Sequence, residues 1–352
     1  MSHNKLTTRI LLGTAILSMG LLTACNPPSS EASGSADLPS SQEELIQLAQ
    51  EEGKVRLGAG GHTQAQAQLL AKEFEAAYGI EVEFIRENSG QIAQKLEAQL
   101  SGGNVSFDVV SLNDSSTLSA WAEEGTVADA AVPNAADIIG PLSTEGESYY
   151  PFTWAALGYS YNSAKLDPAK APGTWADLAA AEGTKAVADP GSSGAALTFA
   201  AIMAEVDKDF FEALGQSNVL TSDSALALGQ MVATGEASFG IPGIEHDIAS
   251  AQLAGEPLTM GYPSGRIGAM ASYMASLESA SSPAAARLLV QFAMSPEFQA
   301  AQLEIGSRSS LAGIPAPKTA EEISEDRISV VDQQDLAENR EAVIESFKQA
   351  IR

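Results

Sequence analysis

Residues 54–78, KVRLGAGGHTQAQAQLLAKEFEAAY, place a short apolar strand, a glycine-rich turn and a helix in direct succession. In the helical part, the apolar residues recur at the three- and four-residue spacing of an amphipathic helix. A strand at 81–85, a helix around 92–100 and a strand at 107–112 repeat the alternation. This spacing predicts an α/β fold with a parallel sheet and crossover helices.

Three loops of this first block carry polar residues. In open α/β sheets, ligands bind beyond the carboxyl ends of the parallel strands. The loops at 59–63, 87–90 and 113–116 follow the three strands, so we expect His62, Ser89 and Asn113 to contribute to a binding site.

The second half of the chain repeats the alternation. Residues 149–162 hold six aromatic side chains and predict a strand that crosses between two lobes. Further expected strands lie at 184–189, 218–221, 237–241, 258–262 and 268–277. Expected helices lie at 194–205, 224–234, 245–254, 283–294 and 296–305, with an amphipathic helix near residues 343–351.

The N-terminus has the features of an export signal. Lys5 and Arg9 precede an apolar run at 10–22 that is too short to span a bilayer as a mature helix. The run ends in Leu22-Thr23-Ala24-Cys25, which resembles the lipobox of bacterial lipoproteins, with a chance cysteine after an ordinary signal peptide as the alternative. We expect residues 1–24 to be a signal peptide, Cys25 the site of lipid attachment and 25–42 a flexible tether.

The chain is strongly acidic. Removal of Lys5 and Arg9 with the signal leaves 17 basic against 45 acidic residues, a net charge of −28. This charge argues against binding to nucleic acid or to an anionic membrane surface, although a local pocket can still hold a small anion. Cys25 is the only cysteine, so no disulfide or thiolate metal site is expected.

A series of short motifs carries a family resemblance. In chain order they are Tyr161-Asn162, Trp175-Ala176-Asp177-Leu178, ADPGSSG at 188–194, TSDSA at 221–225, GEA at 235–237, EHD at 245–247 and SPEFQ at 295–299. From about residue 53 to 315 the chain resembles the extracellular solute-binding proteins of bacterial ABC importers. The most similar branch is that of the ferric-iron, phosphonate and sugar-phosphate binders.

The resemblance implies a two-lobed, type II periplasmic-binding fold with its ligand cleft between the lobes. Lobe 1 would comprise 43–150 and 263–314, and lobe 2 would comprise 151–262 and 315–352. A monomer, lipid-anchored outside the cytoplasmic membrane in the periplasm or at the outer cell surface, would deliver a small-molecule ligand to an ABC permease.

Two serine-containing loops are candidates for anion binding. Ser192 and Ser193 precede the helix expected at 194, and Ser222 and Ser224 precede the next one. Hydroxyls and free backbone N–H groups at a helix N-terminus attract anions. Plain helix caps are the alternative. With Ser89 and Asn113 in the first lobe, these serines would hold the phosphate or phosphonate of a small organic anion.

The second candidate is the tripeptide Glu245-His246-Asp247, together with His62. In similar sugar-phosphate binders, acidic and histidine side chains at this position hold the hydroxyl groups of the organic moiety. Carboxylates accept hydrogen bonds from hydroxyls or amines. A solvated turn that opens the helix is the alternative.

Other ligands stay open. Ferric iron would need phenolate ligands, but the loop at 240–244 lacks the paired tyrosines of iron-binding relatives, and Tyr149-Tyr150 comes too early. A polyamine or thiamine could use an acidic cleft and stack on Trp154 or Tyr159. The acidic residues concerned are Glu87, Asp114, Asp223, Glu245 and Asp247. Arg86 and Arg266 would instead favour an anion.

A secreted hydrolase is the competing class. Its usual motifs are missing, and Gly191–Gly194 is one residue short of a nucleophile elbow. Ser193, His246 and Asp247 remain a conceivable triad, although adjacent His and Asp are poorly placed to pair. The mature chain has two histidines, which do not form a helical pair, so we expect no zinc site and no other metal. Because the hydrolase motifs are missing as well, we expect no cofactor and no enzyme activity.

Overall fold

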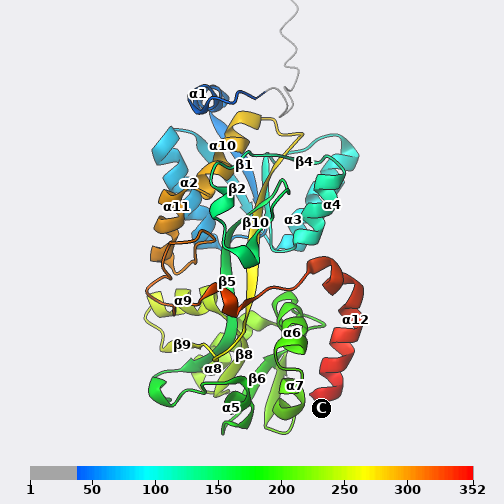
Figure 1. Ribbon diagram of the computed structural model, residues 1–352, viewed down its shortest axis with the longest axis vertical. Coiled ribbons are helices and arrows are strands. Elements are labelled where there is room, and N and C mark those ends of the chain that lie inside the picture. The colour runs from blue at the N-terminus through cyan, green and yellow to red at the C-terminus, as the bar shows by residue number, and fades with distance from the viewer. Residues whose placement is uncertain (1–37, 352) are drawn as a thin grey trace, which may run out of the picture. The chain divides into compact units, whose positions relative to one another are not determined.

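The computed structural model describes residues 38–351. The expected signal peptide, Cys25 and most of the tether therefore lie outside the described residues. The main strands are β1 Lys54–Ala59, β2 Glu81–Arg86, β3 Val109–Leu112, β5 Tyr150–Asn162, β6 Lys185–Ala188, β7 Val219–Ser222, β8 Phe239–Ile244 and β10 Ile267–Leu277. They form one sheet in the order β2-β1-β3-β10-β5-β8-β6-β7 (Figure 1). The short strands β4 Val127–Ala128 and β11 Ile328–Ser329 pair with β10, and β9 Leu258–Gly261 pairs with β5.

The helices largely follow the predicted pattern. They are α1 Gln42–Glu52, α2 Gln64–Tyr78, α3 Ser89–Gly102, α4 Ser115–Glu123, α5 Trp175–Ala180, α6 Gly194–Val206, α7 Phe210–Leu214, α8 Ala225–Thr234, α9 Glu245–Leu253, α10 Pro283–Ala293, α11 Pro296–Ala301 and α12 Gln333–Ala350. Helices α1, α5 and α7 were not anticipated. Helix α1 begins where the tether was expected to end, because Ser41 caps it and Leu45 and Ala49 are buried.

The sheet is parallel in its two outer parts and antiparallel in its centre. Strands β1, β2 and β3 pair in parallel, as do β6, β7 and β8. Strands β5 and β10 pair antiparallel with each other and join these two parts. The parallel sheet with crossover helices, which the strand–helix alternation predicted, is present in each outer part, whereas the antiparallel pairing of the centre was not predicted. The two-lobed α/β class is confirmed, and the expected lobe boundaries stay a prediction.

Strand β5 is the crossing strand that the aromatic stretch predicted. Its first half pairs with β10 and its second half pairs with β8 and β9. All thirteen of its residues are buried. A strand buried on both faces explains why this segment is largely aromatic and apolar, without a regular alternation of polar and apolar residues.

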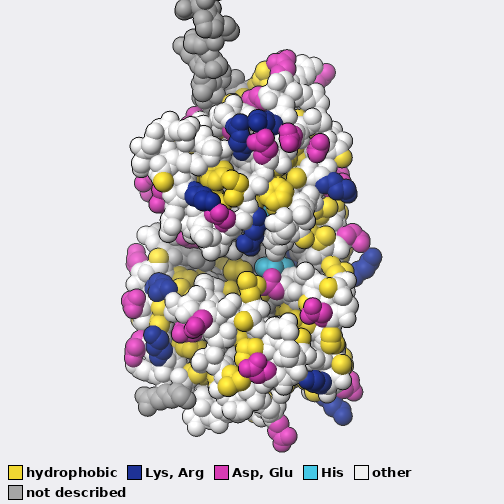
Figure 2. All heavy atoms as spheres, turned by 180° about the vertical axis from the view of Figure 1, so that it is seen from behind, with side chains coloured by type: hydrophobic (Ala, Val, Ile, Leu, Met, Phe, Trp, Pro, Cys, Tyr) yellow, Lys and Arg dark blue, Asp and Glu magenta, His cyan; other side chains and the backbone are white. Residues whose placement is uncertain are grey.

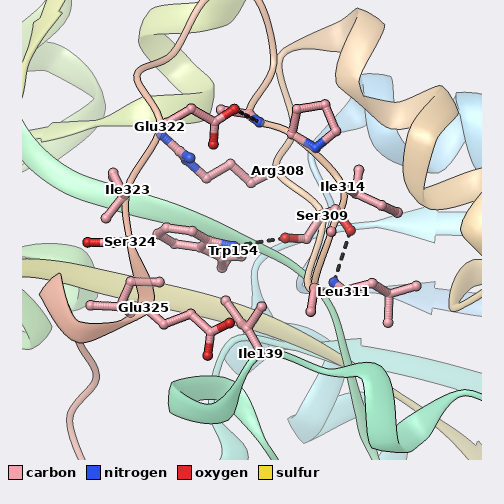
Figure 3. Close-up of a pocket in the computed structure, with 15 residues that line it drawn as sticks. Ile139, Trp154, Arg308, Ser309, Leu311, Ile314, Glu322, Ile323, Ser324 and Glu325 are labelled. Carbon is pink, nitrogen blue, oxygen red and sulfur yellow. Dashed lines mark hydrogen bonds between the residues drawn. The ribbon is translucent and has the colours of Figure 1, made fainter.

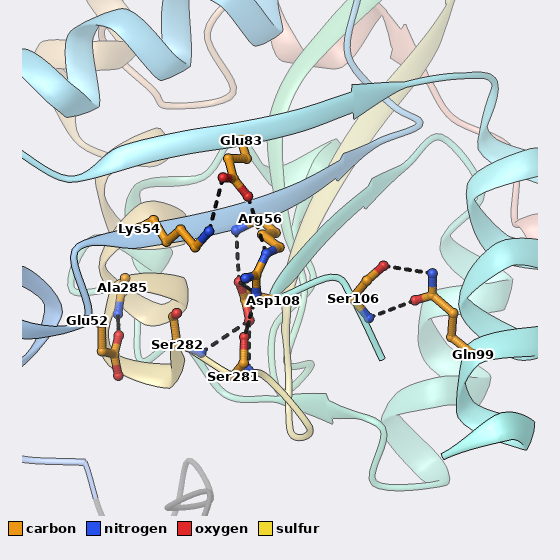
Figure 4. A network of polar contacts seen from close by, with 10 residues as sticks. All are labelled: Glu52, Lys54, Arg56, Glu83, Gln99, Ser106, Asp108, Ser281, Ser282 and Ala285. Carbon is orange, nitrogen blue, oxygen red and sulfur yellow. Dashed lines mark hydrogen bonds and ion pairs between the residues drawn. The ribbon is translucent and has the colours of Figure 1, made fainter. Parts of the chain in front are cut away.

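A buried carboxylate holds the first part of the sheet to the loop before α10. Asp108 accepts hydrogen bonds from the backbone N–H groups of Arg56, Ser281 and Ser282 (Figure 4). Beside it, Glu52 accepts from two backbone N–H groups at the start of α10. A carboxylate at a helix N-terminus is favourable, so this contact fixes α10 against the end of α1.

Helix α12 packs on the helices α6 and α7, which belong to the second part of the fold. Leu336 and Ile344 form a small apolar cluster with Leu197 of α6, and the helix runs alongside α6 and α7 (Figure 1). Among the described residues, every helix is too short or too polar to cross a lipid bilayer.

Candidate functional site

His62 lies in the turn between β1 and α2 and is 2% exposed. Its Nδ1 is 2.6 Å from the Ser111 hydroxyl, and its ring stacks on Phe152 of β5 at a centroid distance of 4.0 Å. Burial, and secondarily the charge of Arg86, lowers the pKa of His62 from 6.5 to about 3. The imidazole is therefore neutral at physiological pH.

Ser89 and Asn113 meet at the start of α3, next to the His62 turn. The Ser89 hydroxyl donates to the Gly60 carbonyl at 3.2 Å and accepts from the Asn113 backbone N–H at 3.0 Å. The Asn113 side-chain oxygen accepts from the Ser272 hydroxyl at 2.7 Å. The structure thus brings together the three residues predicted in this half, and the Ser89 hydroxyl is already engaged within the chain.

The two serine loops of the second half lie side by side. Strands β6 and β7 align Ala188 with Ser222, and the Asp189 N–H donates to the Ser222 carbonyl at 2.8 Å. Ser193 caps α6 by accepting from the Ala196 N–H at 3.4 Å. The adjacent strands β6 and β7 therefore lead into the starts of α6 and α8 from neighbouring positions in the sheet.

The predicted serines differ in whether their hydroxyls already have partners within the chain. Ser192 is exposed. Ser222 donates to the Ser224 carbonyl at 3.1 Å and accepts from its N–H at 3.3 Å, a local turn. Ser224 is the N-cap residue of α8, yet its hydroxyl makes no capping hydrogen bond among the described contacts.

The charges at these helix N-termini differ. The first turns of α3, α6 and α8 contain no acidic residue, whereas that of α9 contains Glu245 and Asp247. An N-terminus without a carboxylate keeps its partial positive charge available to an external anion.

Glu245 is committed to another residue of the chain. It is 1% exposed, and Arg308 donates to both of its oxygens, at 2.6 and 2.8 Å. The Tyr262 hydroxyl also donates to it. Burial and then the charge of Glu245 raise the pKa of Tyr262, which keeps that donor protonated. A Glu245 with these partners positions the start of α9 rather than offering a free acceptor.

His246 and Asp247 are half-buried neighbours on α9. His246 Nε2 lies 3.5 Å from one Asp247 oxygen, so the two side chains do pair although they are adjacent in sequence. The other Asp247 oxygen is buried without a partner among the described atoms. Asp247 also lines a pocket of about 200 Å³ between α8 and α9. Figure 2 shows a histidine side chain beside a transverse hollow on one face.

A larger pocket of about 400 Å³ lies against Trp154 (Figure 3). The Trp154 indole N–H donates to the Ser309 carbonyl at 2.9 Å, and the Arg308 guanidinium lies 4.8 Å from the ring centroid. Trp154, which the sequence suggested could stack on a cationic ligand, is therefore already stacked on a cation of its own chain.

Sequence reasoning missed Ser111, Phe152 and Arg308. Ser111 is the single polar residue of β3, and a hydroxyl within a buried apolar strand is the signal that could have identified it. Arg308 stands in the polar run Gly306–Ser310 that follows the helical residues 296–305, where its burial has no sequence signature.

Comparisons with known proteins agree with this fold. Residues 70–327, more than half of the chain, match the family described as bacterial extracellular solute-binding protein. The chain belongs to this family, whose members are of the ABC-importer solute-binding type. An uncharacterized protein of Haemophilus influenzae (strain ATCC 51907 / DSM 11121 / KW20 / Rd) is 26% identical over 309 residues, 82% of this chain and 88% of that protein.

Solved structures share the architecture. Iron-bound HitA from Pseudomonas aeruginosa superposes with a TM-score of 0.67 at 22% identity, over 84% of this chain and 99% of HitA. AfuA from Actinobacillus pleuropneumoniae, with exogenous fructose-6-phosphate bound, has a TM-score of 0.67 at 24% identity, over 85% and 99% of the two chains. A periplasmic thiamin binding protein gives 0.65 at 19% identity, over 85% and 96%. These similarities show the fold.

Proposed function

We propose that this solute-binding protein captures a small organic anion bearing a phosphate or phosphonate and delivers it to a membrane permease. The observation that best supports this proposal is the pair of adjacent serine loops at the starts of α6 and α8. The first turns of these two helices contain no acidic residue. In a chain with 45 acidic residues, a helix N-terminus without an acid in its first turn is better suited to an anion than the start of α9, which holds Glu245 and Asp247. Ser192, Ser193, Ser222 and Ser224 would bind the anionic group, with Ser89 and Asn113 opposite.

His62, His246 and Asp247 would contact the rest of the ligand. The unpartnered oxygen of Asp247 and the unpartnered nitrogen of His62 support this assignment, because buried polar atoms usually have a partner. Glu245 would act indirectly, by fixing the start of α9.

Iron is a weaker candidate. The segment 240–244 forms the buried end of β8 and has no tyrosine. Tyr150 donates to Asp129 at 2.7 Å, and Tyr149 packs edge-on against Tyr273. Burial raises the pKa of both Tyr149 and Tyr150, which disfavours phenolate formation.

A cationic ligand is also less well supported. Of the acidic residues considered, Glu87 pairs with Lys95, Asp114 caps α4 and Glu245 pairs with Arg308. Acids that already have partners contribute little net attraction to a polyamine or thiamine. A hydrolase is not favoured either, because the family consists of binding proteins.

The same proposal includes the lipid anchor at Cys25, a monomeric state and the lobe boundaries given above. On binding, the two lobes would close around the ligand. Lobe 1 comprises 43–150 and 263–314, and lobe 2 comprises 151–262 and 315–352.

A thermal-shift screen of the mature protein with Cys25→Ser tests the proposal. The panel holds sugar phosphates, phosphonates, inorganic phosphate, ferric citrate, spermidine and thiamine. A ligand at 100 times its Kd stabilises a protein by about 2.7 kcal/mol, which raises the melting temperature measurably. We expect a rise with a phosphate or phosphonate compound. A rise with iron or amines alone would overturn the assigned ligand class.

A further inference from the structure

His62 is a buried side chain whose hydrogen-bonding capacity the chain satisfies on one side only. Its Nδ1 contacts the Ser111 hydroxyl at 2.6 Å, and its Nε2 has no partner among the described atoms. The stacked Phe152 ring, at an interplanar angle of 18°, fixes the plane of the imidazole. A buried polar nitrogen left without a partner costs free energy that a bound ligand can recover.

The hydrogen bonds of Ser111 determine which ring nitrogen carries the proton. Its hydroxyl oxygen accepts from the Gly61 backbone N–H at 3.1 Å, which leaves the hydroxyl proton free to donate. Among the described contacts of Ser111, His62 Nδ1 is the acceptor within reach of that proton. Nδ1 then holds the lone pair, and the neutral ring carries its one proton on Nε2.

The backbone around Ser111 holds this arrangement rigidly. A Cβ atom at Gly60 would lie 2.7 Å from the Ser111 carbonyl oxygen and 2.9 Å from Ser89 Cα. Only glycine allows the turn before His62 to approach β3 so closely. The Gly61 N–H also donates to the Ser111 carbonyl at 2.8 Å, so the turn and the strand end move as one piece.

We propose that Ser111 is a positioning residue that holds His62 as the Nε2–H tautomer, so that the site presents a neutral N–H donor to an acceptor oxygen of the ligand. This inference rests on the function proposed above and refines it, because it assigns His62 to an oxygen of the anionic group rather than to the rest of the ligand. A phosphoryl, phosphonyl or carboxylate oxygen accepts such a bond. In this tautomer Nε2 has no lone pair to offer to a metal such as ferric iron.

The first experiment needs no ligand. Multiple-bond ¹H–¹⁵N NMR of the mature protein with Cys25→Ser at pH 7 shows which imidazole nitrogen is protonated, and His62→Asn identifies the His62 signals. We expect a protonated Nε2 and an unprotonated Nδ1. A protonated Nδ1, an imidazolium or an equal mixture of tautomers would overturn the proposal.

Two variants separate positioning from packing. Ser111→Ala removes the hydroxyl and should give a mixture of tautomers, whereas Ser111→Thr keeps the hydroxyl and should keep Nε2–H. A pure Nε2–H tautomer in Ser111→Ala would show that Ser111 does not set it. If Ser111→Ala does not fold, the spectra of the protein with Ser111 intact and of Ser111→Thr still show whether His62 is held as the Nε2–H tautomer.

Titration then tests whether the His62 Nε2–H group donates to a ligand, with fructose-6-phosphate, inorganic phosphate and ferric citrate as probes. We expect a phosphate probe to shift the Nε2–H signal and Ser111→Ala to weaken its Kd about tenfold, the loss of one good hydrogen bond. An Nε2–H signal that no phosphate probe shifts would contradict the donor role of His62 while the tautomer assignment stands. The absence of any measurable binding of the phosphate probes would contradict the anion function. Line broadening of His62 by ferric citrate, without a response to phosphate, would overturn the donor role.

Discussion

Glu245 and Arg308 form a buried, two-point ion pair between the start of α9 and the polar segment that follows α11. The two side chains are 1% and 4% exposed. Burial works to lower the pKa of Arg308, and the paired Glu245 carboxylate more than offsets this, so that the pKa is raised. Glu245 also accepts from the Ala156 N–H of the crossing strand at 3.4 Å. The pair therefore ties α9, β5 and residues 307–309 together.

Breaking this pair should destabilise the protein strongly. Arg308→Met leaves an unpaired buried carboxylate, and we expect the free energy of unfolding to fall by about 3–5 kcal/mol. Glu245→Gln combined with Arg308→Met should recover much of that loss, because no buried charge remains. Urea denaturation measures both. Lys318→Met, which removes an exposed partner of Glu304, is the matched control and should change little. An equally small effect of Arg308→Met would contradict the structural role of the pair.

His62 predicts a pH dependence of stability. Its pKa is about 3 in the folded protein and about 6.5, the ordinary value for histidine, in the unfolded chain. Below pH 6.5 the unfolded chain therefore binds a proton that the folded chain does not. The free energy of unfolding then falls as the pH drops from 6.5 toward 3, by at most about 1.4 kcal/mol per pH unit. Between pH 7 and pH 5, the protein should lose about 2 kcal/mol more than His62→Asn does. Equal losses in the two proteins would show that His62 is not held neutral.

The sequence predicted the fold well because its elements are strongly patterned. The helix at α2 has a capping box at Thr63 and Gln66 and ends at Gly79, so its limits are set locally. The antiparallel centre was not predicted, because β5 and β10 are mostly apolar and buried, and the residue pattern of such a strand does not determine its direction.

The site was predicted only where local chemistry decides it. Serines before α6 and α8 could be placed because helix starts have a sequence signature. The partners of Glu245 could not, since Arg308 lies 63 residues later and meets it through tertiary packing. The sequence placed Glu245 at the start of a helix facing the cleft. It gave no means to foresee that both carboxylate oxygens would be used within the chain.

The serine loops predict a specific loss of affinity. Ser193→Ala and Ser224→Ala should each weaken binding of the phosphate-bearing ligand about tenfold in calorimetric titrations, because each hydroxyl would contribute one charge-assisted hydrogen bond. Ser295→Ala is a matched control, since Ser295 caps α11 by accepting from the Phe298 N–H at 3.2 Å. It should cost about 1 kcal/mol of stability and leave the Kd unchanged. Unchanged affinity in both loop variants would show that the anion binds elsewhere.

Substitution of Asp247 should separate the contribution of the organic part of the ligand to the affinity from that of its anionic group. One of its oxygens is buried without a partner, and a carboxylate oxygen accepts well from a sugar hydroxyl. Asp247→Ala should therefore weaken a sugar phosphate about tenfold while leaving inorganic phosphate unchanged or slightly improved, because a like charge is removed. Asp177→Ala, on the first turn of α5, is the control acid and should affect neither ligand. Parallel titrations of both ligands against both variants separate the two roles. An equal loss for sugar phosphate and phosphate would mean that Asp247 supports the fold of the site rather than reading the sugar.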